Sequence, residues 1–163
     1  MATVPGIPTP SIEDFYRAHA PAVRAFLISL SRDPHFADDL VQETFIKATR
    51  SLDGYRGGSP RAWLFTIARS VFIDAVRRTR AIPVDEVPES GIDAPDTGER
   101  LVIADVLEAL PARQRRAILL VDEAGLSYQE AADVMGTTLG AMKVLLHRAR
   151  SNFRSIYTEN TDD

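Results

Sequence analysis

A proline-rich acidic stretch, residues 82–98, divides the helical pattern of this sequence in two. It contains Pro83, Pro88 and Pro95 among acidic and small residues, and its few apolar side chains show no helical period. Such a composition cannot bury enough apolar surface to offset the entropy that is lost on ordering the chain. We therefore expect a flexible acidic linker at residues 81–98 between two small domains, rather than one continuous core.

On both sides of this linker, apolar residues recur at spacings of three and four, and no segment sustains an alternation of period two. The predicted helices cover residues 12–31, 34–51, 60–80, 99–110, 112–124, 128–135 and 139–156. Pro21 is expected to kink or split the first of them. The sequence therefore predicts an all-α protein of two small helical domains, residues 11–80 and 99–156, with a disordered lead at 1–10 and an acidic tail at 157–163.

The net charge of −4 conceals two basic domains. Residues 1–80 carry 11 Lys and Arg against 8 Asp and Glu, and residues 111–156 carry 7 against 4. Between them, residues 81–110 hold eight acids and one base. Binding of nucleic acid by the two domains is therefore compatible with a chain that is acidic overall.

The sequence lacks the residues and segments that several classes of function require. There is no cysteine, and the three histidines are scattered along the chain, so we expect neither a metal site nor a cofactor. No constellation of catalytic side chains is found, which argues against an enzyme. No segment approaches the roughly 18 consecutive apolar residues that span a bilayer, and the first residues do not resemble a signal peptide. We expect a cytoplasmic protein without membrane insertion.

Residues 127–150 have the pattern of a helix-turn-helix. Ser127 and Glu130 form a capping box, and Gly136 supplies the positive φ that the turn requires. The outward side of the second helix carries Thr138, Lys143, Val144, His147, Arg148 and Arg150. Side chains in such positions can enter a major groove. A helical hairpin with a solvated basic face would have the same spacing, but the basic surplus favours DNA binding.

The N-terminal domain has two unusual surfaces. The predicted helix at 34–51 exposes an acidic stripe with one apolar side chain, a pattern that is usually only solvated. The helix at 60–80 follows a glycine-rich loop and carries arginines interleaved with Trp63, Phe65 and Phe72. Arginines bind phosphates and aromatic rings stack on unpaired bases, so this pattern is typical of a single-strand binder. The alternative is that Trp63 and Phe72 belong to the core.

Four segments carry a family resemblance: DDLVQETFIKA, RAWLFTIARSVFIDAVRR, LPARQRRAILLVDEAGLSYQEAADVMG and LHRARSNFR. In this order and spacing, they resemble a bacterial RNA polymerase sigma factor of the extracytoplasmic function (ECF) group, over residues 12–155. The resemblance implies a subunit that directs core RNA polymerase to promoter DNA, helps to open the minus-ten region and is silenced by an anti-sigma factor. The alternative is a stand-alone helix-turn-helix regulator with an N-terminal sensing or dimerisation domain.

The resemblance also implies roles for individual residues. The clamp coiled coil of the largest polymerase subunit is bound by Asp38, Asp39, Gln42, Glu43 and Ile46. The minus-ten element, with a flipped base, is bound by Tyr55, Arg56, Ser59, Arg61, Trp63, Arg69, Arg77 and Arg78. The minus-thirty-five element is read by the outward residues of the helix-turn-helix. The sequence departs from the family pattern at Val144 and Leu145, where a polar and a basic residue are usual, and at Ser70, where asparagine is usual.

Overall fold

The computed structural model describes residues 11–55, 57, 59–80 and 99–162, and helices are the only regular secondary structure in these residues. The all-α prediction is therefore confirmed, whereas the predicted lead and linker lie outside the described residues. The first domain contains α1 (Ile12–Ser31), α2 (Pro34–Arg50), the short 3-10 turn η1 (Leu52–Gly54) and α3 (Pro60–Arg80). The second contains α4 (Glu99–Ala109), α5 (Ala112–Ile118), the π-helical η3 (Leu119–Glu123), α6 (Tyr128–Met135) and α7 (Leu139–Thr161).

Side-chain caps confirm the predicted starts of four helices. The side chains of Asp33, Ser59, Ser127 and Thr138 accept hydrogen bonds from backbone N–H groups in the first turns of α2, α3, α6 and α7. Glu130 completes the capping box, because its carboxylate accepts the N–H of Ser127 at 2.8 Å. Gly136 ends α6 with a φ of +66°, which a residue with a side chain adopts only at a cost.

Three helices differ from the prediction. Pro21 lies inside α1 and does not split it, because the proline is on the exposed side, where water can replace the lost backbone hydrogen bond; a kink at Pro21 stays a prediction. The helix predicted at 112–124 changes at Leu119 into a π-helical turn, in which the N–H of Ala124 reaches the carbonyl of Leu119 at 2.8 Å. The last helix continues to Thr161, because no glycine or proline interrupts residues 157–161.

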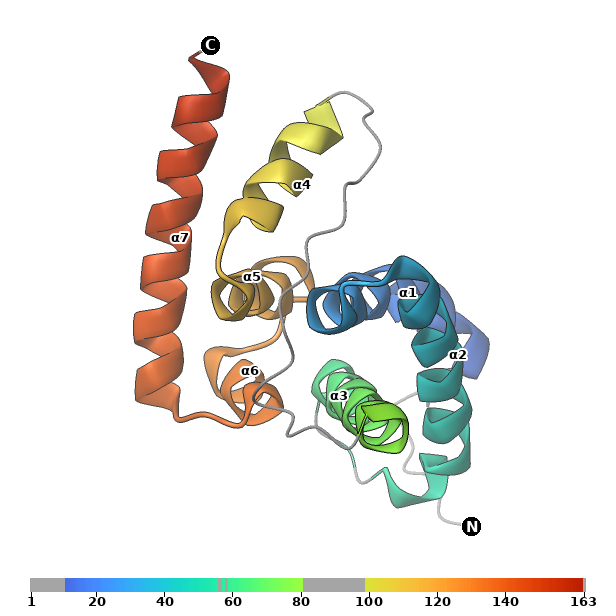
Figure 1. The fold of residues 1–163 in the computed structure, drawn as a ribbon. Helices are drawn as coiled ribbons and strands as arrows, with labels where there is room; N and C mark the ends of the chain where they lie inside the picture. The colour runs from blue at the N-terminus through green and yellow to red at the C-terminus, as the bar shows by residue number, and fades with distance from the viewer. Residues whose placement is uncertain (1–10, 56, 58, 81–98, 163) are drawn as a thin grey trace.

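One hydrophobic core runs through both domains. Its largest fully buried side chains include Phe26, Phe65, Leu27, Leu40, Leu64, Leu120, Met142 and Leu146. In Figure 1, α5 lies beside α1 and α6 lies beside α3, and the α1–α5, α1–η3 and α3–α6 pairs are in contact. The two domains, whose arrangement the sequence left open, are thus packed together in this structure.

Arg115 is a buried cation that ties α5 to the end of α4, and it is only 3% exposed. Its guanidinium donates hydrogen bonds to the carbonyl oxygens of Leu107, Glu108 and Leu110 at 2.7, 3.0 and 3.1 Å. Carbonyls at a helix C-terminus lack N–H partners from a following turn, so a positive donor there is doubly favourable. This role of Arg115 cannot be predicted from the sequence, because it depends on how α4 and α5 pack against each other.

Replacing Arg115 by Ala is expected to lower the free energy of unfolding by about 2 kcal/mol, since buried carbonyls lose a charged donor. Arg115→Lys should recover only part of this loss, because one ammonium group cannot reproduce the planar fork. Urea denaturation followed by circular dichroism measures the effect. Arg113→Ala, at an exposed position of α5, is the control and should change little. Equal stability of the Arg113 and Arg115 variants would contradict the assignment.

Candidate polymerase and DNA interfaces

The outward face of α2 brings together all the predicted polymerase-binding residues. Asp38, Asp39, Gln42, Glu43 and Ile46 are all exposed, and Ile46 keeps 52% of its surface accessible. The opposite face of α2 packs against α1 and α3. The result is an acidic surface with one apolar side chain in it, as the sequence predicted.

Two ion pairs orient carboxylates of this surface. Asp38 accepts a hydrogen bond from Arg24 of α1 at 2.6 Å, and this bond lowers the pKa of Asp38. Glu43 pairs with Arg78 of α3 at 3.3 Å. Arg78, a predicted minus-ten residue, therefore lies beside the α2 face. Both pairs are solvent-exposed, so a partner can rearrange them at little cost.

The aromatic side chains before and within α3 divide into a half-buried pair, Tyr55 and Trp63, and a buried pair, Phe65 and Phe72. Tyr55 packs against Trp63 with ring centroids 5.3 Å apart, and Trp63 is half-buried. Phe65 and Phe72 are 1% and 3% exposed, so their interpretation as base-stacking residues is wrong. They lie in the hydrophobic core that α3 shares with α1, α2 and α6. Arg56 lies outside the described residues.

Three predicted minus-ten residues lie against the second domain. The hydroxyl of Ser59 is hydrogen-bonded to the carboxylate of Glu130. The Nη1 atom of Arg61 lies 2.7 Å from the point where a Cβ on Gly125 would stand, and Nη2 of Arg69 lies 3.7 Å from the corresponding point on Gly136. Gly125 therefore lets Arg61 approach the backbone closely, whereas a Cβ on Gly136 would make only an ordinary van der Waals contact with Arg69. In this arrangement, the second domain covers part of the predicted DNA-binding side of α3.

Glu130 joins the first turns of α6 and α3. The pKa of Glu130 is lowered chiefly by the hydrogen bond from the N–H of Ser127, then by the hydroxyl of Ser59 and, among weaker causes, by the charge of Arg61. Helix N-termini carry partial positive charge, so a carboxylate between two of them is stabilised in its ionised form. The capping box thus has a second role that its sequence pattern does not reveal.

The helix-turn-helix consists of α6, the turn at Gly136 and α7. Met142 and Leu146 of α7 are buried, and Lys143, Val144, His147 and Arg148 are exposed on the outward side. The exposed fraction of Val144 is 52%. Thr138 is the N-cap of α7, with its hydroxyl accepting the N–H of Ala141 at 3.1 Å. Leu145, where the family pattern has a basic residue, is half-buried against the core.

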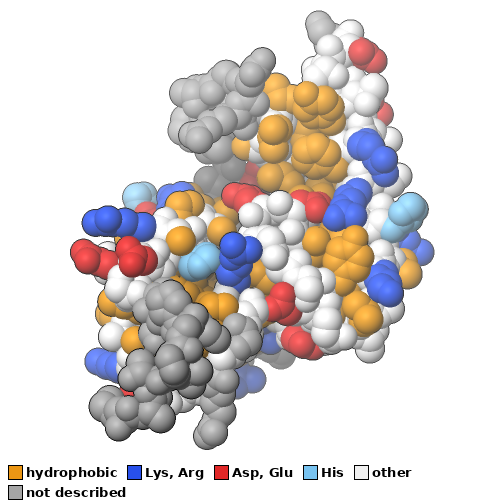
Figure 2. All heavy atoms as spheres, turned by 180° about the vertical axis from the view of Figure 1, so that it is seen from behind, with side chains coloured by type: hydrophobic (Ala, Val, Ile, Leu, Met, Phe, Trp, Pro, Cys, Tyr) orange, Lys and Arg blue, Asp and Glu red, His pale blue; other side chains and the backbone are white. Residues whose placement is uncertain are grey.

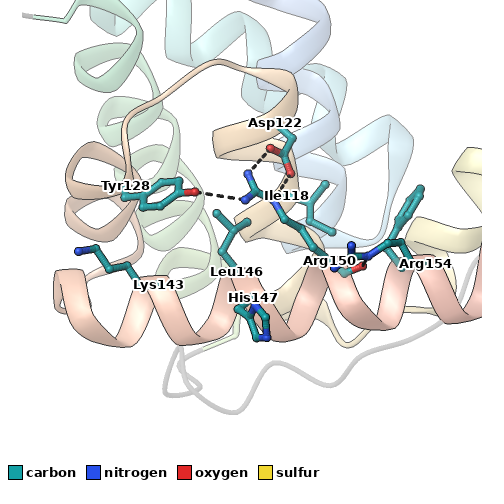
Figure 3. A pocket seen from close by; sticks show the side chains of 9 residues that line it. Ile118, Asp122, Tyr128, Lys143, Leu146, His147, Arg150 and Arg154 are labelled. Atoms are coloured by element: carbon teal, nitrogen blue, oxygen red, sulfur yellow. Dashed lines mark hydrogen bonds and ion pairs between the residues drawn. The ribbon is translucent and has the colours of Figure 1, made fainter.

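Arg150 differs from the other predicted cations of α7. Its guanidinium binds the carboxylate of Asp122 through two hydrogen bonds, of 3.1 and 2.6 Å, and donates to the hydroxyl of Tyr128 at 3.2 Å (Figure 3). These partners raise the pKa of Arg150. The guanidinium is therefore engaged within the domain.

Ser70 keeps a polar link between α2 and α3. Its hydroxyl lies 3.2 Å from Nζ of Lys47, and the same ammonium lies 3.8 Å from a carboxylate oxygen of Asp74. The departure from asparagine at this position therefore leaves the two helices joined by polar contacts.

Apolar side chains also gather between α4 and α7, as Figure 2 shows from behind. Ile103 of α4 and Tyr157 of α7 are 51% and 42% exposed, and Phe153 stacks on Tyr157 with ring centroids 6.2 Å apart. No helix in the described ranges is long and apolar enough to cross a bilayer. No group of three side chains of metal-binding type was found in the same ranges.

Comparison with known proteins identifies the family. The models of Sigma-70 region 2 and Sigma-70 region 4 match residues 15–82 and 100–152. The chain is 36% identical to the ECF RNA polymerase sigma factor EcfG of Rhodopseudomonas palustris, over 95% of this chain and 90% of that protein. It is 33% identical to the ECF sigma factor SigE of Mycolicibacterium smegmatis, over 94% of this chain and 64% of that protein.

A solved structure shares the fold. The sigma factor RpoE of Bartonella quintana, crystallised in complex with the anti-sigma factor NepR, has a TM-score of 0.65 and 32% sequence identity, and the match covers 90% of this chain and 98% of that one. The resemblance seen in four sequence segments is thus confirmed. The chain belongs to the ECF group of RNA polymerase sigma factors.

Proposed function

We propose that this chain directs core RNA polymerase to promoters by docking through α2 and contacting DNA through α3 and α7. One observation carries the proposal: an acidic docking surface and a cationic helix-turn-helix lie in separate domains of one chain. A subunit that recognises two separated DNA elements on a polymerase needs this combination. The chain would supply no catalytic group of its own and would work where bacterial polymerase works, in the cytoplasm.

The α2 face is the proposed contact for the clamp coiled coil of the largest polymerase subunit. Its acidic side chains suit a basic partner surface, because complementary charges speed encounter and fix the register of an interface. Ile46 supplies an apolar contact at the C-terminal end of the acidic stripe. Interfaces commonly combine a desolvated apolar centre with a polar rim.

The start of α3 is the proposed site of minus-ten binding and strand opening. Flipping a base costs a few kcal/mol of stacking energy, which stacking on Tyr55 and Trp63 can offset. Arg77 is exposed and available for phosphates. Ser59 and Arg69 are half-buried beside the second domain and would become more accessible if that domain withdrew, whereas Arg61 is already exposed. Strand opening by this route needs binding energy and no nucleotide hydrolysis.

The outward side of α7 is the proposed reader of the minus-thirty-five element. Lys143, His147 and Arg148 can donate hydrogen bonds to base edges or phosphates, and Val144 can contact a thymine methyl group. Thr138 lies at the N-terminus of α7, where backbone N–H groups favour a phosphate. Arg150 is left out of this set because its guanidinium is bound to Asp122.

An anti-sigma factor is the proposed inhibitory partner. The similar sigma factor RpoE was solved with the anti-sigma factor NepR. In this chain, the exposed apolar side chains of Ile46 and Val144 lie within the proposed polymerase and DNA surfaces. A protein that covered either of them would block the corresponding contact.

Replacing both Lys143 and Arg148 by Ala is expected to weaken promoter binding by holoenzyme at least about thirtyfold, since two contacts of about 1 kcal/mol or more each are lost. Filter binding over a range of salt concentrations measures it, on a promoter located by mapping RNA 5′ ends after overexpression. Arg113→Ala removes an exposed charge from α5 and serves as the control. Unchanged binding by the double variant would show that α7 is not the reading helix.

A further inference from the structure

Four basic residues follow one side of α7 at spacings of four, three and four residues. Lys143, His147, Arg150 and Arg154 line a groove of about 820 Å³ together with Asp122 and Tyr128 (Figure 3). Within the described ranges, Arg150 is the only one of the four with a carboxylate partner. Arg150 is therefore paired, while Lys143 and His147, which belong to the proposed reading surface, have no carboxylate partner among the described residues.

The π-helical turn η3 puts Asp122 in reach of Arg150. A π-turn accommodates one residue more than an α-turn and rotates the side chains around it, and such turns often mark functional positions. Figure 3 shows Arg150 directed across the groove toward Asp122 and Tyr128. The phenol of Tyr128, the first residue of α6, receives a third guanidinium N–H and lies under the cation, with its ring centroid 5.9 Å away.

The geometry points to Asp122 as a positioning residue that withholds Arg150 from DNA. We infer that, while α7 contacts DNA, Asp122 keeps the guanidinium turned into the groove, so that the domain makes one phosphate contact fewer than its sequence suggests. This inference rests on the proposed function, in which α7 reads DNA. Phosphate contacts strengthen binding to every sequence alike, so withholding one shortens residence at sites that are not promoters.

Asp122→Asn tests this inference, measured in reconstituted holoenzyme on promoter duplex. Freeing one cation for a phosphate should steepen the slope of log affinity against log salt by about 0.9. When the salt concentration rises fourfold, the affinity of the Asp122→Asn variant should therefore fall by roughly threefold more than the affinity of the parent. A merely structural role of Asp122 would weaken binding without steepening the slope. Glu123→Gln, at the next residue, removes the same charge but frees no paired cation, so it should leave the slope unchanged.

The double variant Asp122→Asn with Arg150→Gln tests whether Arg150 is withheld from DNA, even if the single variant Asp122→Asn folds poorly. It removes both members of this partly exposed pair, so neither side chain is left without its partner. We expect its slope to equal that of the parent. A slope lower than the parent's by about 0.9 would mean that Arg150 already touches a phosphate, and the inference would be overturned.

The same titration separates this inference from the proposed function. Lys143→Ala should lower the slope or the affinity if α7 contacts DNA at all. If Lys143→Ala has no effect, the reading helix itself is misassigned. If Lys143→Ala has its effect but Asp122→Asn and Glu123→Gln steepen the slope equally, only the role of Asp122 fails.

Discussion

The affinity of the chain for core polymerase is expected to fall at least a hundredfold when Asp39 and Glu43 are both replaced by Lys. The two residues are four positions apart on α2 and are exposed on the same face as Ile46. Placing like charges opposite each other at an interface costs several kcal/mol, and a hundredfold loss requires only about 2.7 kcal/mol. Fluorescence anisotropy of labelled chain titrated with core polymerase measures the affinity.

The fold should survive this charge reversal. Glu43 pairs with Arg78 at the surface, where an ion pair contributes at most about 1 kcal/mol. The matched control is Glu13→Lys with Asp53→Lys, which changes the net charge equally at two exposed positions outside α2. If the control and the α2 variant lose affinity equally, the effect is one of overall charge. If neither loses affinity, the docking surface lies elsewhere.

Local signals in the sequence were sufficient for the helix starts and for the exposed stripes. A cap such as Asp33 or Ser59 acts on N–H groups only two or three residues away, so its effect can be predicted without knowing the tertiary structure. The acidic face of α2 follows from helical periodicity in the same way. These two signals located most of the candidate polymerase and minus-thirty-five residues.

Contacts between distant segments could not be predicted from the sequence. Arg115 looks like one more surface cation of a basic helix, and only the fold of α4 onto α5 buries it. Arg150 likewise matches the reading stripe, and only the π-turn brings Asp122 to it. Phe65 and Phe72 fit both a stacking surface and a core, and the packing of neighbouring helices decides between them.

The packing of the two domains against each other predicts a large conformational change during holoenzyme assembly. Withdrawal of the second domain from α3 would free Arg61 from its place beside Gly125 and uncover the half-buried Arg69, and we expect a movement of about one helix diameter, 10 Å. The chain has no cysteine, so Ala18→Cys and Ser155→Cys can be spin-labelled selectively on α1 and α7. We expect a single narrow distribution of the distance between the two labels in the free chain. When core polymerase and promoter are bound, this distance should increase by at least about 10 Å.

A second label pair distinguishes separation of the domains from distortion within one. Ala104→Cys and Ser155→Cys lie on α4 and α7, which pack together in the second domain, so their distance should stay constant in both states. If the α1–α7 distance is the same in free and promoter-bound chain, the second domain does not withdraw. Arg69 then stays partly covered, and the minus-ten element would be bound by the half-buried Tyr55 and Trp63 together with the exposed Arg61 and Arg77. If the distance lengthens with core polymerase before DNA is added, docking through α2 is sufficient to uncover Arg69.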